Sequence, residues 1–177
     1  MSPATMSPPD HTARSLRSCL GRFATGVAVV SFAAEGETEP RGLTVNSFTS
    51  VSMEPPLVLV SVARRARSHD ALRGRPFCVN VLGAEQEPLA RRFAGGARGE
   101  QTAEDEPTWL RDRVAPRLAG ALALLACEPW RDYDGGDHTL FLGRVVDYDF
   151  RDGDALGYHA SRYTPIADEQ LGIEDLL

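Results

Sequence analysis

The segment 41–62 constrains the fold more than any other part of the chain, because core-forming and hydrogen-bonding residues are interleaved in it. Its apolar members are Leu43, Val45, Phe48, Val51 and the run 57–60. Among them stand short uncharged polar residues, namely Thr44, Asn46, Ser47, Thr49, Ser50 and Ser52. Buried polar groups are costly unless they are partnered, and a surface strand more often carries charged residues. The pattern therefore predicts strands whose polar groups meet a phosphate or a polar heterocycle.

Size and charge exclude several classes of protein. The chain has 177 residues with 42% hydrophobic content, which is enough for one well-packed domain. Its net charge of −6 argues against a nucleic-acid-binding module, which is usually basic. No apolar run approaches the ~20 residues of a membrane span. We expect no nucleic-acid partner and no membrane insertion.

The N-terminus and the cysteines indicate the compartment. Residues 1–11 contain three prolines and no Lys or Arg, and they lack the apolar centre of a signal peptide. They predict a disordered tail on a cytoplasmic protein. The three cysteines, Cys19, Cys78 and Cys127, are too few and too far apart for a disulfide framework or a zinc site. Cys78 and Cys127 lie in apolar runs and are predicted to be small core residues.

Periodicity and turn residues predict mostly strands. We expect helices at 12–23, 68–72 and 86–93 and strands at 27–34, 42–51, 57–62, 77–82, 121–133 and 138–150. The tetrad Asp134-Gly135-Gly136-Asp137 is a strong hairpin signal between the last two strands. Ser68 is expected to cap the short helix after it. The segment 95–120, which carries the acidic cluster 104–106, is expected to be a long surface excursion.

Hairpin-connected strands with few helices suggest a mainly β fold, a closed antiparallel barrel with peripheral helices. Closure removes the exposed strand edges that such a sheet would otherwise present. We expect one domain over 12–166 and a C-terminal tail over 167–177.

Four segments in this order, 20–27, 42–52, 56–62 and 136–143, closely resemble the flavin reductase-like family. They read LGRFATGV, GLTVNSFTSVS, PLVLVSV and GDHTLFLG. The resemblance covers about 16–163, most of the chain. It implies a split β-barrel of Greek-key-like antiparallel strands that binds FMN or FAD, usually as a homodimer. It also implies hydride transfer from NADH or NADPH to flavin N5, to supply a separate flavin-dependent monooxygenase. No Gly-x-Gly-x-x-Gly fingerprint supports a Rossmann cofactor site.

The resemblance also implies site residues. Those expected to bind cofactor are Thr44, Val45, Asn46, Ser47, Ser50, Ser61, Val62, Ala63, Arg67, Ser68, Phe93 and Tyr163. For Ser61, Val62 and Ala63 the expected contacts are backbone amides, with ordinary strand termination as the alternative. Arg67 and Ser68 suit a phosphate, with a solvated basic turn as the alternative. Three arginines at 64, 65 and 67 cannot all bind one phosphate. Polarity satisfied by the backbone is the alternative for the strand residues, and core packing is the alternative for Phe93.

His138, in Gly136-Asp137-His138, is the expected catalytic residue. An imidazole there can hydrogen-bond the nicotinamide or a flavin oxygen, or deliver a proton to reduced flavin. Its alternative role is a turn histidine capped by Asp137. His69 is expected only to cap a helix, and Tyr163 either covers the nicotinamide pocket or packs in a dimer. No metal-ligand cluster and no Ser-His-Asp set is evident.

Two functions from different classes remain open at this point. The first is an NAD(P)H:flavin oxidoreductase that feeds an oxygenase. The second is a flavin-binding electron carrier or sensor without reductase turnover, and an intact Gly-Asp-His motif favours the first. A split-barrel oxidase of another substrate has no further sequence support. The apolar strands 121–126 and 140–146 predict part of a dimer interface with C2 symmetry.

Overall fold

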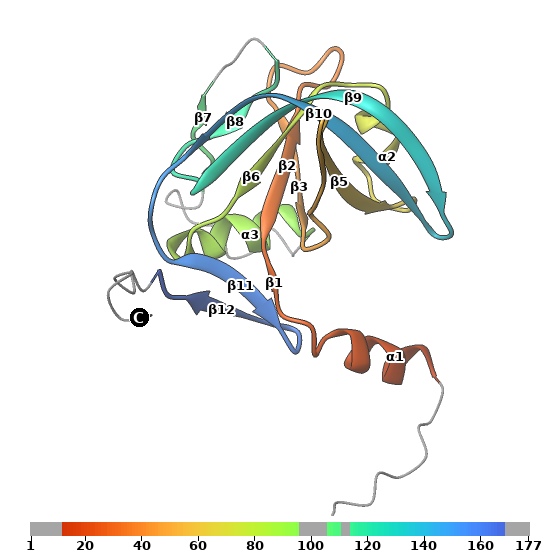
Figure 1. The fold of residues 1–177 in the computed structure, drawn as a ribbon, viewed down its shortest axis with the longest axis vertical. Helices are drawn as coiled ribbons and strands as arrows, with labels where there is room; N and C mark the ends of the chain where they lie inside the picture. The colour runs from red at the N-terminus through yellow and green to blue at the C-terminus, as the bar shows by residue number, and fades with distance from the viewer. Residues whose placement is uncertain (1–11, 96–105, 111–113, 169–177) are drawn as a thin grey trace, which may run out of the picture.

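A computed structural model describes residues 12–95, 106–110 and 114–168. The predicted N-terminal tail, most of the acidic cluster and residues 169–177 lie outside the described residues. A seven-stranded antiparallel sheet dominates the fold (Figure 1), in the order β3-β2-β6-β9-β10-β5-β4. Its strands are β2 (Ala28–Phe32), β3 (Arg41–Val45), β4 (Thr49–Met53), β5 (Pro56–Ala63), β6 (Phe77–Val81), β9 (Ala123–Gly135) and β10 (His138–Phe150).

Chain connectivity explains why this sheet rolls into a barrel. Its two edge strands, β3 and β4, are consecutive in sequence and are separated only by residues 46–48. A flat sheet of this order would hold its edges far apart, since neighbouring strands are spaced about 4.8 Å. The prediction of one unbroken strand over 42–51 is therefore wrong. As β3 the chain pairs with β2 up to residue 45, and as β4 it pairs with β5 from residue 49.

The barrel interior is filled by alternate residues of its strands. Val30, Phe32, Val60, Phe77 and Phe141 belong to this core and are buried. The predicted core cysteines, Cys78 and Cys127, are buried as expected. Burial and the neighbouring Cys78 raise the pKa of Cys127 to about 12, so its thiol stays protonated.

A second core lies between the outer side of β2 and the smaller elements. It joins Val27 and Val29 to Leu82, Ala90 and Leu156. These elements are η1 (Ala84–Gln86), α3 (Glu87–Phe93) and the sheet β1-β11-β12, formed by β1 (Thr25–Gly26), β11 (Ala155–His159) and β12 (Arg162–Ile166). All five residues of β2 are buried because both of its faces are covered. No strand pattern in the sequence predicted the sheet β1-β11-β12.

The 95–120 excursion is described only in part. It contains β7 (Trp109–Leu110) paired with β8 (Arg117–Leu118). The buried amide of Asn80 fixes this pair to the barrel. Its Oδ1 accepts from the Leu118 N–H at 2.7 Å, and its Nδ2 donates to the Val29 carbonyl at 2.7 Å.

Helix α1 (Ala13–Leu20) projects away from the barrel (Figure 1). Thr12 caps its N-terminus with Ser15 in a capping box, and Gly21 ends it. None of its residues is buried, so the apolar face predicted for this helix does not pack on the described part of its own chain. No helix in the described ranges has the length and apolar character needed to cross a membrane.

The surface predicted for a dimer interface is buried only in part. Ala121, Leu122 and Ala126 are buried within the chain, and so is Phe141. Ala123, Leu124 and Leu125 are only half-buried, so the placing of part of the interface on 121–126 stays a prediction. On β10, Val146 is exposed.

Candidate functional site

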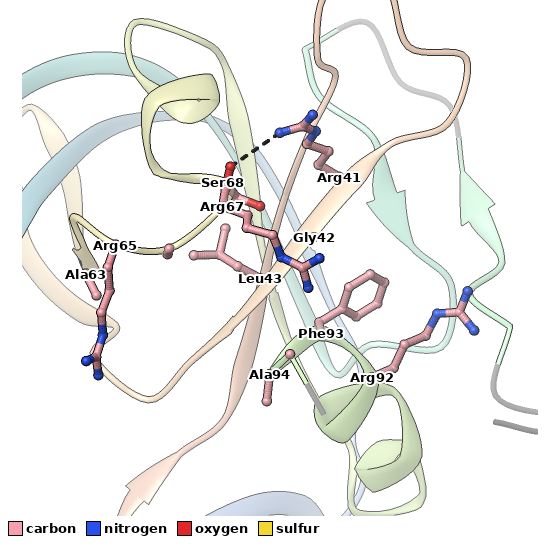
Figure 2. A pocket seen from close by; sticks show the side chains of 12 residues that line it. Arg41, Gly42, Leu43, Ala63, Arg65, Arg67, Ser68, Arg92, Phe93 and Ala94 are labelled. Atoms are coloured by element: carbon pink, nitrogen blue, oxygen red, sulfur yellow. Dashed lines mark hydrogen bonds between the residues drawn. The ribbon is translucent and has the colours of Figure 1, made fainter. Parts of the chain in front are cut away.

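A cavity of about 840 Å³ opens where β3, the loop after β5 and the end of α3 meet. It is lined by Arg41, Gly42, Leu43, Ala63, Arg65, Ala66, Arg67, Ser68, Arg92, Phe93, Ala94 and Gly95. Figure 2 shows Arg41, Arg65 and Arg92 on three sides of the hollow, with Arg67 extending toward Phe93. Four arginines and no carboxylate appear among these lining residues. A chain of net charge −6 therefore builds a cationic cavity.

Two of these arginines are already paired. Arg41 forms an ion pair with Glu37, and this hydrogen-bonded contact holds the pKa of Glu37 below its usual range. Arg92 donates to both carboxylate oxygens of Glu106, at 2.9 and 3.1 Å. Arg41 also donates to the Arg67 carbonyl at 3.5 Å, which joins β3 to the loop after β5. Neither Arg41 nor Arg92 was predicted, because no local pattern shows that residues 51 positions apart meet here.

The structure separates the three arginines of the loop after β5. The Arg64 Nε donates to the Gly136 carbonyl at 2.9 Å and its guanidinium lies 3.3 Å from Asp134, so it anchors the loop to the β9–β10 hairpin. Arg65 and Arg67 line the cavity. Helix α2 (His69–Leu72) follows, with Ser68 at its N-cap. Ser68 makes no side-chain capping hydrogen bond, contrary to expectation, and it lines the cavity.

Phe93 stands on the cavity wall because Gly42 leaves room for it. A Cβ at Gly42 would lie 2.7 Å from Phe93 Cδ1. The ring also packs against Trp109, with centroids 5.8 Å apart. Phe93 is thus both a packing residue of the second core and a wall of the cavity.

A smaller hollow of about 180 Å³ continues from Ala94 along the end of β3. It contains the predicted residues Thr44, Val45, Asn46 and Tyr163. The Thr44 hydroxyl donates to the Ala90 carbonyl at 2.7 Å, so it is satisfied within the chain. Asn46 is exposed. Burial raises the pKa of Tyr163, whose ring lies 5.0 Å from the Arg91 guanidinium carbon.

Four other predicted residues, Ser47, Ser50, Ser61 and Val62, do not line either hollow. The Ser47 hydroxyl donates to the Ser61 carbonyl at 2.9 Å and accepts from the Ser61 N–H at 3.0 Å. This pair ties the 46–48 turn to β5 where the barrel closes, and the Ser61 amide is engaged by it. Val62 is a core side chain, and Ser50 is exposed on β4. Their roles as ligands stay predictions.

His138 begins β10 opposite Ala63, which lines the larger cavity. Its side chain is 41% exposed and is not among the lining residues. Its Nδ1 lies 2.6 Å from Asp137 Oδ1, and this contact holds the pKa of Asp137 below its usual range. The contact with Asp137 that a turn histidine would make is thus present. It leaves Nε2 free of this carboxylate and does not exclude contact with a ligand.

The chain is similar to known proteins over most of its length. Residues 20–167 match a protein family described as flavin reductase like domain. An NADH-dependent FAD reductase of Streptomyces globisporus is 45% identical, with 87% of each chain covered. The reductase component of 4-nitrophenol 4-monooxygenase/4-nitrocatechol 2-monooxygenase of Rhodococcus opacus is 37% identical, over 83% of this chain and 77% of that protein.

A solved structure adds a comparison of the whole fold. The NADH:FAD oxidoreductase SgcE6 of Streptomyces globisporus, in complex with NAD and FAD fragments, superposes with a TM-score of 0.79. It is 39% identical, with 94% of this chain and 99% of that chain covered. The mainly β, antiparallel split-barrel fold predicted from the sequence is confirmed.

Proposed function

The chain belongs to the flavin reductase-like family, and on that premise we propose that it is an NADH:flavin oxidoreductase that reduces free FMN or FAD. The observation that carries the proposal is the arginine-lined cavity beside the polar end of β3. Its volume lies within the ~300–1,000 Å³ range of small-molecule sites. Arginines suit phosphate, and the amide and hydroxyl groups of the smaller hollow suit a polar ring system.

The residues present fit a flavin nucleotide. Arg67 and Ser68 would hold its phosphate, and Phe93 would pack against an aromatic part of the ligand. Thr44, Asn46 and Tyr163 would surround the ring end in the smaller hollow. When bound, the flavin supplies an acceptor for hydride from the nicotinamide.

The protein's own part in such a reaction is orientation and charge. Two rings that exchange hydride must be held in contact and shielded from water, and this needs no covalent help. Asp137 accepts from Nδ1 of His138 and so orients the imidazole, leaving Nε2 to bind the nicotinamide or to hold a proton near the flavin. The cationic cavity attracts both anionic nucleotides.

The decisive experiment follows NADH and NADPH oxidation by the purified protein with FMN, FAD or no added flavin. We expect NADH oxidation that depends on added flavin. A protein that binds flavin tightly but leaves both nicotinamides unoxidised would instead be an electron carrier or sensor. Relatives named as reductases favour turnover over the carrier.

The Rhodococcus opacus relative is named as a reductase component of a monooxygenase, which supports a similar role here. We propose that the reduced flavin is passed to a separate flavin-dependent monooxygenase.

We also propose that the chain forms a homodimer, with an interface that includes α1. Leu20 and Phe23 are 65% and 78% exposed, yet a helix of this length is marginal in water unless it packs on something. Arg14 and Arg17 lie on α1 with Leu20. At the end of β10, Tyr148 and Phe150 are exposed beside Asp149. These surfaces complement each other in charge and apolar character. Light scattering should give a dimer mass that Leu20→Glu reduces, and a monomeric wild type would refute the proposal.

A further inference from the structure

His69, the first residue of α2, is built into the protein behind the wall of the larger cavity. Its side chain is buried, with 3% of the residue exposed. Its Nε2 lies 2.8 Å from the hydroxyl of Thr139, which is itself only 2% exposed. The ring also meets Phe141 edge-on, with centroids 5.6 Å apart. A helix-capping role, as predicted from the sequence, does not explain these contacts with β10.

The hydrogen bonds fix the orientation of the imidazole. Nδ1 lies 2.7 Å from Asp70 Oδ1, and an ionised carboxylate can only accept. Nδ1 therefore carries the proton in the neutral ring, and Nε2 accepts from the Thr139 hydroxyl. Loss of that hydroxyl would leave Nε2 buried without its partner, which is costly.

This contact is one of two anchors of the same loop. At the other anchor, the Arg64 N–H donates to the Asp137 carbonyl at 2.9 Å. Between the anchors lie Arg65, Ala66, Arg67 and Ser68, all of which line the cavity. Both anchors bind residues of the segment 137–139, which includes His138. The cavity wall is thus fixed to the strand that presents the expected catalytic histidine.

We propose that His69 and Thr139 are positioning residues for the phosphate end of the flavin. They contact no ligand, and they hold the wall 65–68 at a fixed distance from β10 so that Arg67 and Ser68 face one phosphate. The inference rests on the proposed function, since it assigns that wall to the flavin phosphate.

The test compares Thr139→Val, which removes the hydroxyl and keeps the side-chain shape, with Thr139→Ser, which keeps the hydroxyl. Dissociation constants are measured by flavin fluorescence for FMN, FAD and riboflavin, which lacks the phosphate. Thr139→Val should raise the FMN and FAD constants about fivefold to tenfold, the effect of one hydrogen bond. Riboflavin binding and kcat at saturating flavin should stay within about twofold, and Thr139→Ser should restore FMN binding.

A second variant covers the case in which Thr139→Val does not fold. Asp70 is 97% exposed at its side chain, so Asp70→Ala leaves the core intact while it removes the acceptor that orients His69. It should raise the FMN constant about twofold to fourfold and leave riboflavin unchanged. Equal losses for FMN and riboflavin, or no loss in either variant, would overturn the proposal. A wild type that binds FMN but leaves NADH unoxidised would refute the reductase function and leave this binding test valid.

Discussion

Replacing Arg67 with alanine tests the cationic cavity most directly. Arg67 lines the cavity and is exposed, and in the part of the chain that the structure describes its guanidinium has no ion-pair partner. Arg41 and Arg92, in contrast, are each neutralised by a glutamate. The charge of Arg67 is therefore available to a ligand, and its removal breaks no described side-chain hydrogen bond or ion pair within the protein.

The expected loss follows from the type of bond. A hydrogen bond to a charged group contributes about 1.5–3 kcal/mol, which corresponds to a rise of about 10- to 150-fold in the dissociation constant. Because Arg67 is exposed, screening places the effect near the lower end and makes it shrink as salt increases. Titration of FMN by fluorescence at low and high salt measures both features. The free energy of unfolding should change by less than about 0.5 kcal/mol.

Two controls separate a phosphate contact from a general effect of charge. Arg73→Ala removes an exposed arginine outside the cavity, 3.6 Å from Asp132, and should leave FMN binding unchanged. Riboflavin binding should be the same in Arg67→Ala and in wild type. If Arg67→Ala binds FMN as tightly as wild type does, the assignment of this wall to the phosphate is wrong.

Three further predictions concern neighbouring residues. His138→Ala should raise the apparent KM for NADH or lower kcat while flavin affinity stays nearly intact. Substitution of the exposed His159 by alanine serves as the control. Normal kinetics of His138→Ala with NADH and NADPH would show that His138 is only a turn residue. Asn46→Ala should weaken flavin binding about fivefold at almost constant stability. Ser47→Ala should instead lose its two hydrogen bonds to Ser61 and about 2 kcal/mol of unfolding free energy. Equal changes of flavin affinity and stability in the two variants would contradict the assignment of Asn46 to the flavin site. Gly42→Ala places a Cβ 2.7 Å from Phe93 and should lower the free energy of unfolding by about 1–3 kcal/mol and alter flavin binding. Gly26→Ala, which has nothing within 4 Å of the added Cβ, should cause no steric clash and serves as the control. An unchanged Gly42→Ala protein would show that Phe93 is not held by this contact.

Local sequence pattern determined most of the elements. The predicted strand 138–150 coincides with β10, and the strands near 27–34, 57–62 and 77–82 appear as β2, β5 and β6. Alternation of side chains and turn residues encode such elements, because they act over a few neighbouring positions. The polar segment 44–46 was likewise recognisable, and it lines a hollow together with Tyr163.

Tertiary structure decided which residues meet. Arg41 and Arg92 join Arg65 and Arg67 around one cavity only because the barrel closes and α3 packs against β3. The same closure breaks the predicted strand 42–51 and gives Ser47 a partner on β5. From the sequence, His69 is expected only to cap a helix, yet packing buries it against Thr139, 70 residues away. Hydrogen-bond partners at such separations depend on how the strands are ordered in the sheet, which no local pattern of residue types specifies.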